Sequence, residues 1–243
     1  MIRQLGAMDP QIADVIGKGD AAIADFLKHS ARLSSLMDTK GSPDALQEVS
    51  SFTVSKDLNP KVSELCLLVR DEASTAVAAF RDAEMWIRLK APAVSDGNNF
   101  GVDVQNFVLG EVQHMRAAME AMTTTGRDYH WSRAQGLEKL FGEEKQEKTS
   151  SQTHETDEKE KSSTVKKSSS EKSSSATPPG YADYKEYVHA LDVRHYQVTL
   201  NQLLDVRNNY LKAHVLFTKN MKRLSDPRGE GEDGKSGNAM SMF

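Results

Sequence analysis

The chain has 243 residues, 38% of them apolar, and 31 Lys and Arg against 35 Asp and Glu leave a net charge of -4. This balance predicts no nucleic-acid or membrane-surface partner, because the negative charge of nucleic acids and of anionic membranes would not attract a chain with a net negative charge. The single cysteine, Cys66, excludes an intrachain disulfide framework and a cysteine-cluster zinc site, and we expect a buried apolar role for it. No apolar run is long enough to span a bilayer, so we expect a soluble intracellular protein, cytoplasmic or nuclear.

The first two predicted helices begin in the same way. Asp9-Pro10 and Asn59-Pro60 each place a capping side chain before a proline at the first helical position. Gly41-Ser42-Pro43 ends the first helix and Pro92 ends the second. Apolar residues recur at steps of three and four in both, which predicts one buried face per helix. In the first helix they are Ile12, Val15, Ile16, Ile23, Phe26, Leu27, Leu33, Leu36 and Met37, and in the second Val62, Leu65, Val69, Ala73, Val77, Phe80, Ala83 and Ile87.

Two further helices follow. Apolar residues from Val104 to Met122 mark the third, which could continue to Phe141, although Gly126 weakens its middle. The fourth runs from about Tyr181 to Leu224 and would be about 65 Å long. Its apolar residues cover more than one narrow seam, so it should pack against its own bundle and against something else, such as a neighbouring subunit.

Residues 143–180 form a low-complexity insert of Ser, Lys, Glu and Thr, with Val165 and Ala176 as its only apolar members. Such a segment cannot bury enough surface to offset its chain entropy, so we expect it to be disordered. The sequence therefore predicts an all-α fold: a single up-down-up-down four-helix bundle over residues 1–243, with this insert and a flexible tail at 226–243. Antiparallel connectivity would place the loop between helices two and three beside the tail, and the insert at the opposite end.

Motifs of common catalytic sites are missing from the chain, including the phosphate loop, the nucleophile elbow and the dinucleotide-binding turn. We therefore expect no cofactor and no enzymatic activity. Glu111-x-x-His114 and Glu186-x-x-His189 raise the alternative of a di-iron bundle enzyme, which needs one further Glu from each remaining helix. Residues 10 to 37 contain no Glu, so solvated side chains are the better interpretation. A plain helical scaffold is the other alternative.

The connector between helices two and three is the most specific part of the sequence. It begins shortly after Trp86-Ile87-x-Leu89 and reads Asp96-Gly97-Asn98-Asn99-Phe100-Gly101-Val102, followed by Val104-Gln105. Alone, Asp-Gly-Asn-Asn is ordinary turn chemistry. The whole stretch, however, resembles the activation loop of the 11S regulators, the REG-type proteasome activators. The resemblance resumes in helix four at Asp183-Tyr184-Lys185, Val188-His189-x-Leu191-Asp192, Arg207-Asn208-x-Tyr210, Lys219-Asn220 and Pro227-Arg228-Gly229.

Regulators of this family form heptameric rings of four-helix bundles and use no nucleotide. Their C-terminal tails enter pockets of the core proteasome α ring, and their activation loops displace the gate segments. The resemblance thus implies an ATP-independent proteasome activator whose partners are the α ring and its own copies, as a homo- or hetero-heptamer. The implied activation loop is Ala93, Val94, Ser95, Asp96, Gly97, Asn98, Asn99, Phe100 and Gly101; the docking tail is Ala239, Met240, Ser241, Met242 and Phe243; the helix-end motif is Pro227, Arg228 and Gly229.

The chain departs from its relatives in three places. Its Lys- and Glu-containing insert lies between helices three and four, whereas relatives carry one between helices one and two. Ala93 and Ser95 stand where relatives have a basic and an acidic residue. The tail after Gly229 is long, acidic and rich in glycine, and it ends in Phe243 where relatives often end in Tyr. The loop asparagine that is critical in the family aligns with Asn98.

Overall fold

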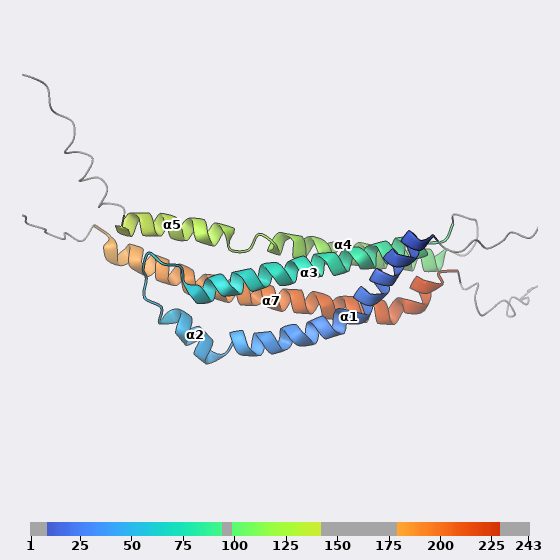
Figure 1. Cartoon of the computed structure of the whole chain (residues 1–243), viewed down its shortest axis with the longest axis horizontal. Helices are drawn as coiled ribbons and strands as arrows, with labels where there is room; N and C mark the ends of the chain where they lie inside the picture. Colours follow the sequence, from blue (N-terminus) through green and yellow to red (C-terminus); the bar gives the residue numbers. More distant parts are fainter. Residues whose placement is uncertain (1–8, 94–98, 142–178, 229–243) are drawn as a thin grey trace, which may run out of the picture.

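The computed structural model describes residues 9–93, 99–141 and 179–228. Long helices lie side by side in an antiparallel bundle, with α5 continuing the direction of α4 (Figure 1). This confirms the predicted all-α bundle for the part of the chain that is described. The helices are α1 (Pro10–Lys40), α2 (Pro43–Ser50), α3 (Pro60–Lys90), α4 (Phe100–Met122), α5 (Arg127–Phe141) and α7 (Tyr181–Ser225).

The predicted helix starts are confirmed in atomic detail. The Asp9 carboxylate accepts a hydrogen bond from the backbone N–H of Gln11 at 2.8 Å. The Asn59 side-chain oxygen accepts from the backbone N–H groups of Lys61 and Val62 at 3.2 and 3.4 Å. Both caps satisfy donors that have no partner within their own helix, so the start positions follow from local chemistry.

The centre of the bundle is an aromatic cluster contributed by α1, α3 and α7. The Phe26 ring lies 5.6 Å from Phe80, 6.0 Å from Tyr210 and 5.8 Å from Phe217, measured between centroids. All four side chains are buried. The apolar stripes predicted for these helices meet at this point, and offset or tilted rings at such distances pack favourably.

Cys66 on α3 is buried, as the sequence predicts. Its sulfur lies 4.0 Å from the Thr199 hydroxyl on α7. Burial raises the pKa of the Cys66 thiol, which keeps it protonated and unreactive.

Helix α2 was not expected from the sequence. Gly41-Ser42-Pro43 ends α1, as predicted, but it also begins a new helix, because the Ser42 hydroxyl accepts from the backbone N–H of Ala45 at 3.3 Å. Val49 is buried on its inner side. The end of one helix and the start of the next thus share three residues.

The third predicted helix is divided in two. A turn at 123–126 separates α4 from α5, and Gly126 has φ 92°, in the left-handed region that favours glycine. Gly126 is buried near Cys66, so a side chain here would meet both an unfavourable backbone conformation and the α3 surface. Continuation through to Phe141 as one helix is therefore wrong, and Gly126 is the reason.

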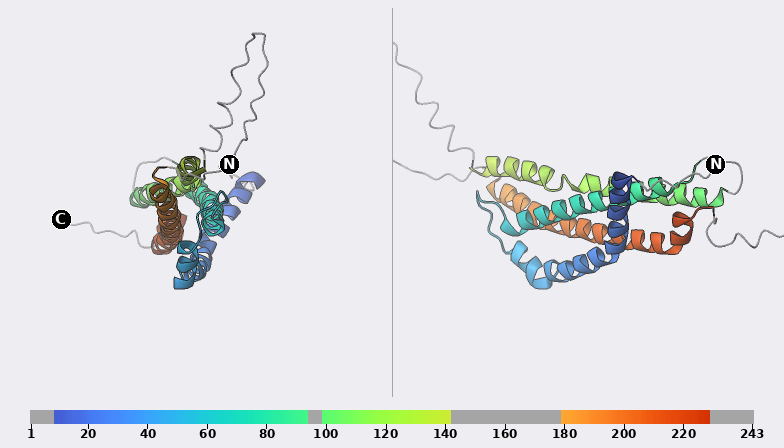
Figure 2. Two further views of the ribbon diagram at one scale, coloured as in Figure 1. Left: turned by 90° about the vertical axis from the view of Figure 1, so that its left-hand side faces the viewer. Right: turned by 45° about the vertical axis from the view of Figure 1, so that its right-hand side comes forward.

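The two ends of the bundle carry different segments. The end of α3, the start of α4 and the end of α7 lie at one end, which we call the loop end; the end of α5 and the start of α7 lie at the other (Figures 1 and 2). The predicted insert and tail fall largely on residues 142–178 and 229–243, outside the described residues. Their flanks lie at opposite ends of the bundle, as the antiparallel topology requires.

Candidate functional site

At the loop end, the chain that leaves α7 packs directly on the start of α4. A Cβ atom at Gly101 would lie 1.9 Å from the carbonyl oxygen of Pro227. Both residues are buried. Only glycine permits two backbones to approach this closely, so Gly101 fixes how the end of α7 sits against α4.

Arg228 contacts the other side of the same connector. Its Nη2 donates a hydrogen bond to the carbonyl oxygen of Ala93 at 2.7 Å. Ala93 precedes residues 94–98, and Gly101 follows them closely. The segment after α7 therefore touches both flanks of the 94–98 connector, and the sequence motif Pro227-Arg228 provides both contacts.

Gln105 joins three helices behind this contact. Its Nε2 donates to the carbonyl oxygen of Leu224 at 2.9 Å and to that of Lys90 at 3.4 Å. The last carbonyls of a helix have no acceptor role within it, so a buried side-chain donor satisfies them. Gln105 thereby ties the ends of α7 and α3 to α4. We call Ala93, Gly101, Gln105, Pro227 and Arg228 the loop-end cluster.

Phe100 stands at the first position of α4, and 61% of its surface is exposed. The guanidinium carbon of Arg223 lies 5.6 Å from the centre of its ring. A cation over the ring face is attracted by the ring quadrupole, so Arg223 orients Phe100 without covering it. The loop end thus presents an oriented aromatic ring to its surroundings.

Of the site residues predicted from the sequence, Ala93, Asn99, Phe100, Gly101, Pro227 and Arg228 are described, and all lie at the loop end. The remaining loop residues at 94–98, Gly229 and the docking tail at 239–243 lie outside the described residues. Sequence reasoning assigned no role to Gln105. The available signal was its position on the buried face of α4, four residues after Gly101, where a polar residue needs a partner.

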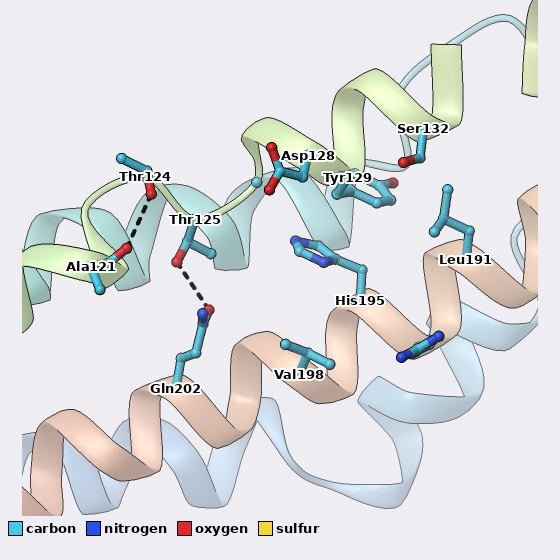
Figure 3. A pocket seen from close by; sticks show the side chains of 12 residues that line it. Ala121, Thr124, Thr125, Asp128, Tyr129, Ser132, Leu191, His195, Val198 and Gln202 are labelled. Carbon is cyan, nitrogen blue, oxygen red and sulfur yellow. Dashed lines mark hydrogen bonds between the residues drawn. The ribbon is translucent and has the colours of Figure 1, made fainter. Parts of the chain in front are cut away.

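A second polar region lies at the break between α4 and α5. A hollow of about 440 Å³ opens there between the turn and α7. Thr125 donates to the Gln202 side-chain oxygen at 3.0 Å on one side, and the His195 imidazole points into the hollow beneath Tyr129 (Figure 3). The His195 and Tyr129 rings stack at 4.4 Å.

Asp192 is the centre of a buried hydrogen-bond cluster next to that hollow, which it reaches through Tyr129. It accepts hydrogen bonds from the Tyr129 hydroxyl at 2.8 Å, Arg133 Nε at 3.1 Å and the Asn59 amide at 3.3 Å. Asp192 and Arg133 are each only 2% exposed, so the charges are paired inside the bundle. Burial and the Asp192 carboxylate raise the pKa of Tyr129, which therefore acts only as a donor. The cluster fastens α5 and the start of α3 to α7.

The structure does not bring the two Glu-x-x-His pairs together. Glu111 lies 4.0 Å from Lys212 on α7, whereas His189 lies 2.7 Å from the Ser50 carbonyl oxygen. His189 and Lys212 are separated by about 35 Å of α7, so a shared di-iron centre is wrong on distance. Within the described ranges, no three His, Cys, Asp or Glu side chains are grouped to bind a metal. None of the described helices combines the length and apolarity that crossing a membrane requires.

The family described as Proteasome activator PA28, C-terminal, matches residues 55–170 and 166–234 of the chain. The chain belongs to the PA28 family. This confirms the resemblance to 11S regulators that the connector and helix-four motifs indicate. The first matched region contains Ala93, Gly101 and Gln105 of the loop-end cluster, and the second contains Pro227 and Arg228.

Among curated proteins, this PA28-family chain is 26% identical over 172 residues to Proteasome activator complex subunit 2 of Homo sapiens, covering 71% of the chain and 57% of that protein. It is 20% identical over 176 residues to Proteasome activator complex subunit 3 of Homo sapiens, covering 72% and 55%. The chain thus spans little more than half the length of these curated relatives.

Solved structures show the same fold. The 11S subunit of the Plasmodium falciparum proteasome, PA28, matches with a TM-score of 0.64 and 17% identity, covering 93% of this chain and 99% of that one. The archaeal 20S proteasome in complex with mutated P26 activator also contains a chain matching with a TM-score of 0.64, at 12% identity, covering 90% and 92%. At these identities the likeness establishes the bundle architecture.

Proposed function

We propose that this PA28-family chain is a non-enzymatic subunit of a heptameric ring that docks on the core proteasome and opens its gate without ATP, stimulating peptide hydrolysis. The observation that carries the proposal is the loop-end cluster. It places the chain that leads to the tail against both flanks of the 94–98 connector. The names of the relatives, which are proteasome activator subunits, supply the partner. Such a subunit would work inside the cell, where core proteasomes are.

In this proposal the tail and the connector have separate tasks. The tail residues 239–243 of each copy bind the α ring, and several weak contacts on one ring act together at high effective concentration. The connectors, including Asn98, press on the gate segments. Because Pro227 and Arg228 contact the flanks of the connector, tail binding would set the position at which each connector meets the gate.

Substituting Asn98→Tyr tests the assignment of the connector. We expect the variant to assemble and bind core proteasome as the wild type does, but to stimulate peptide hydrolysis at least tenfold less, because a bulky ring obstructs the contact with the gate. The measurements are hydrolysis of a fluorogenic peptide by purified core proteasome and binding to immobilised core proteasome. As a matched control, Asn201→Tyr changes an exposed asparagine on α7 far from the loop end and should stimulate normally.

Full stimulation by the Asn98→Tyr protein would show that the connector does not activate. Loss of assembly as well as binding would show instead that the connector serves the fold. Failure of the wild-type protein to stimulate core proteasome at any concentration would overturn the proposed function itself.

A further inference from the structure

The start of α1 carries an apolar face that its own bundle buries only in part: Val15 and Ile16 are half-buried, Ile16 packs against the core, and Ile12 is exposed. Ile12 and Val15 lie on the same face as Gly19, Ile23 and Phe26, at successive steps of three and four residues. Burial along α1 begins only at Gly19. Ile12 is 41% exposed, although residues with this spacing belong to the core further along the helix.

α1 crosses α3 closely at the point where its start turns away from the rest of the bundle. A Cβ atom at Gly19 would lie 2.5 Å from the Trp86 Cβ, and the Trp86 indole N–H donates to the Asp20 carboxylate at 2.6 Å. At this point α1 passes across α3, and its first turns point to the side away from α4 and α7 (Figure 2). The helix start therefore projects as an arm, which we define as Pro10–Lys18.

The outer surface of α4 and α7, on the other side of the bundle, is the counterpart. Phe107 on α4 is 60% exposed and Val215 on α7 is 45% exposed. They flank the contact between Glu111 and Lys212, so they belong to one surface that spans the two helices. We call this the α4–α7 face.

The α1–α3 crossing at the base of the arm and Phe107 on the α4–α7 face lie at nearly the same height along the bundle. Gln105 hydrogen-bonds the Lys90 carbonyl oxygen, which sets the level of α4 against α3. Phe107 is two residues inward from Gln105, and Trp86 is four residues inward from Lys90. At 1.5 Å per residue the two levels differ by about 3 Å. A rotation about an axis parallel to the bundle preserves height, so it would bring the base of the arm of one copy level with Phe107 of the next.

Charge favours the same pairing. Asp9 immediately precedes the arm as its helix cap, and within the arm Lys18 pairs with Asp14 at 2.7 Å, so the arm together with its cap carries one net negative charge. The α4–α7 face continues along α7 to the exposed Lys219 and Lys222, which share a stripe with Val215. An acidic, apolar arm on one side and a basic, apolar face on the other are complementary in both respects.

We propose that the arm of each copy packs across the α4–α7 face of the next copy, with Ile12 and Val15 on Phe107 and Val215. This inference rests on the proposed ring, whose axis must run along the bundles if every loop end is to meet one partner surface. The contact is head-to-tail, because it joins two different surfaces of the same chain, and repetition by rotation closes it into a ring. The occupant of each exposed apolar surface is thus a second copy of the chain.

The test is the native mass of single variants as a function of protein concentration. Ile12→Asp and Phe107→Asp each place a charge in the proposed contact but at exposed positions, so each chain should keep its fold and its helical circular dichroism. We expect each to raise the concentration of half-assembly at least tenfold. Leu27→Asp and Trp131→Asp provide matched controls, since these side chains are 49% and 68% exposed and lie outside the contact; they should assemble as the wild type does.

Disulfide trapping gives a second, independent readout. Chains with Ile12→Cys mixed with chains with Phe107→Cys should form cross-linked pairs on oxidation, whereas either variant alone should not, because a head-to-tail contact never places identical residues together. Cys66 is buried and should not compete.

Normal assembly of Ile12→Asp and Phe107→Asp, or cross-linking of either cysteine variant with itself, would overturn the proposed contact. In that case a wild-type ring that still stimulates core proteasome would leave the proposed function intact. A wild-type protein that forms no ring would overturn both.

Discussion

At the residue scale, Gly101 is the position at which the loop-end cluster tolerates least change. The atom that an added Cβ would meet is a backbone carbonyl oxygen, that of Pro227, which cannot rotate away. We expect Gly101→Ala to lower the free energy of unfolding by about 1–3 kcal/mol, the usual cost of overpacking a close contact. The displaced Pro227-Arg228 segment should also weaken stimulation of core proteasome.

Gly110 on the same helix is the matched control. A Cβ there would meet no atom within 4 Å. Gly110→Ala should therefore raise the free energy of unfolding by roughly 0.5–1 kcal/mol, because alanine loses less backbone entropy in a helix interior. Denaturant unfolding of both variants at equal native mass measures the difference. Equal effects of the two substitutions would mean that the Gly101 contact contributes nothing.

At the element scale, α5 packs on α7 through side chains that include His130 and His195, and these two histidines make the stability of the packing depend on pH. Burial and then the nearby Arg133 charge lower the pKa of His130, and burial and then His130 lower the pKa of His195. Both imidazoles therefore stay neutral in the folded protein when their unfolded counterparts take up protons. The unfolded state binds more protons below a pH of about 6.5, so stability must decrease as the pH falls.

We accordingly expect the melting temperature to fall between about pH 7.5 and 5.5, through the ordinary histidine pKa. A His130→Gln/His195→Gln double variant should show a clearly smaller fall, because glutamine does not titrate. His114→Gln, at an exposed position on α4, should leave the wild-type pH dependence unchanged. Calorimetry across this range decides the matter, and an unaltered pH dependence in the double variant would contradict the role of these two histidines.

At the scale of the whole molecule, the proposed docking by several tails predicts that binding depends steeply on the number of tails. Rings mixed from wild-type chains and chains lacking residues 239–243 should bind core proteasome progressively more weakly, with affinity falling by a similar factor for each tail lost. Half-truncated rings should bind at least a hundredfold more weakly. The native mass of the mixed rings should stay constant, which serves as the control for assembly. If the affinity instead fell in simple proportion to the fraction of tails removed, each tail would act alone.

The sequence by itself determined the helix starts, most of each buried face and the family, although Ile12 and Leu27 of the predicted first stripe are exposed. A helix start depends on a cap within three residues, as at Asp9 and Asn59, and an apolar stripe depends on a step of three or four. The connector motif is likewise contiguous. Both partners of such an interaction lie within one or two helical turns, so a short stretch of sequence contains all the residues involved, and these features could be predicted.

Only the tertiary structure decided which of these residues meet. The Gln105 bond to Leu224 joins positions 119 apart, and the Arg228 bond to Ala93 joins positions 135 apart. The direction of the α1 arm depends on the close contact between Gly19 and Trp86, and the sequence around either residue does not show that the two meet. Such contacts depend on the relative height and rotation of packed helices, and these arise from the fit of all the buried side chains together.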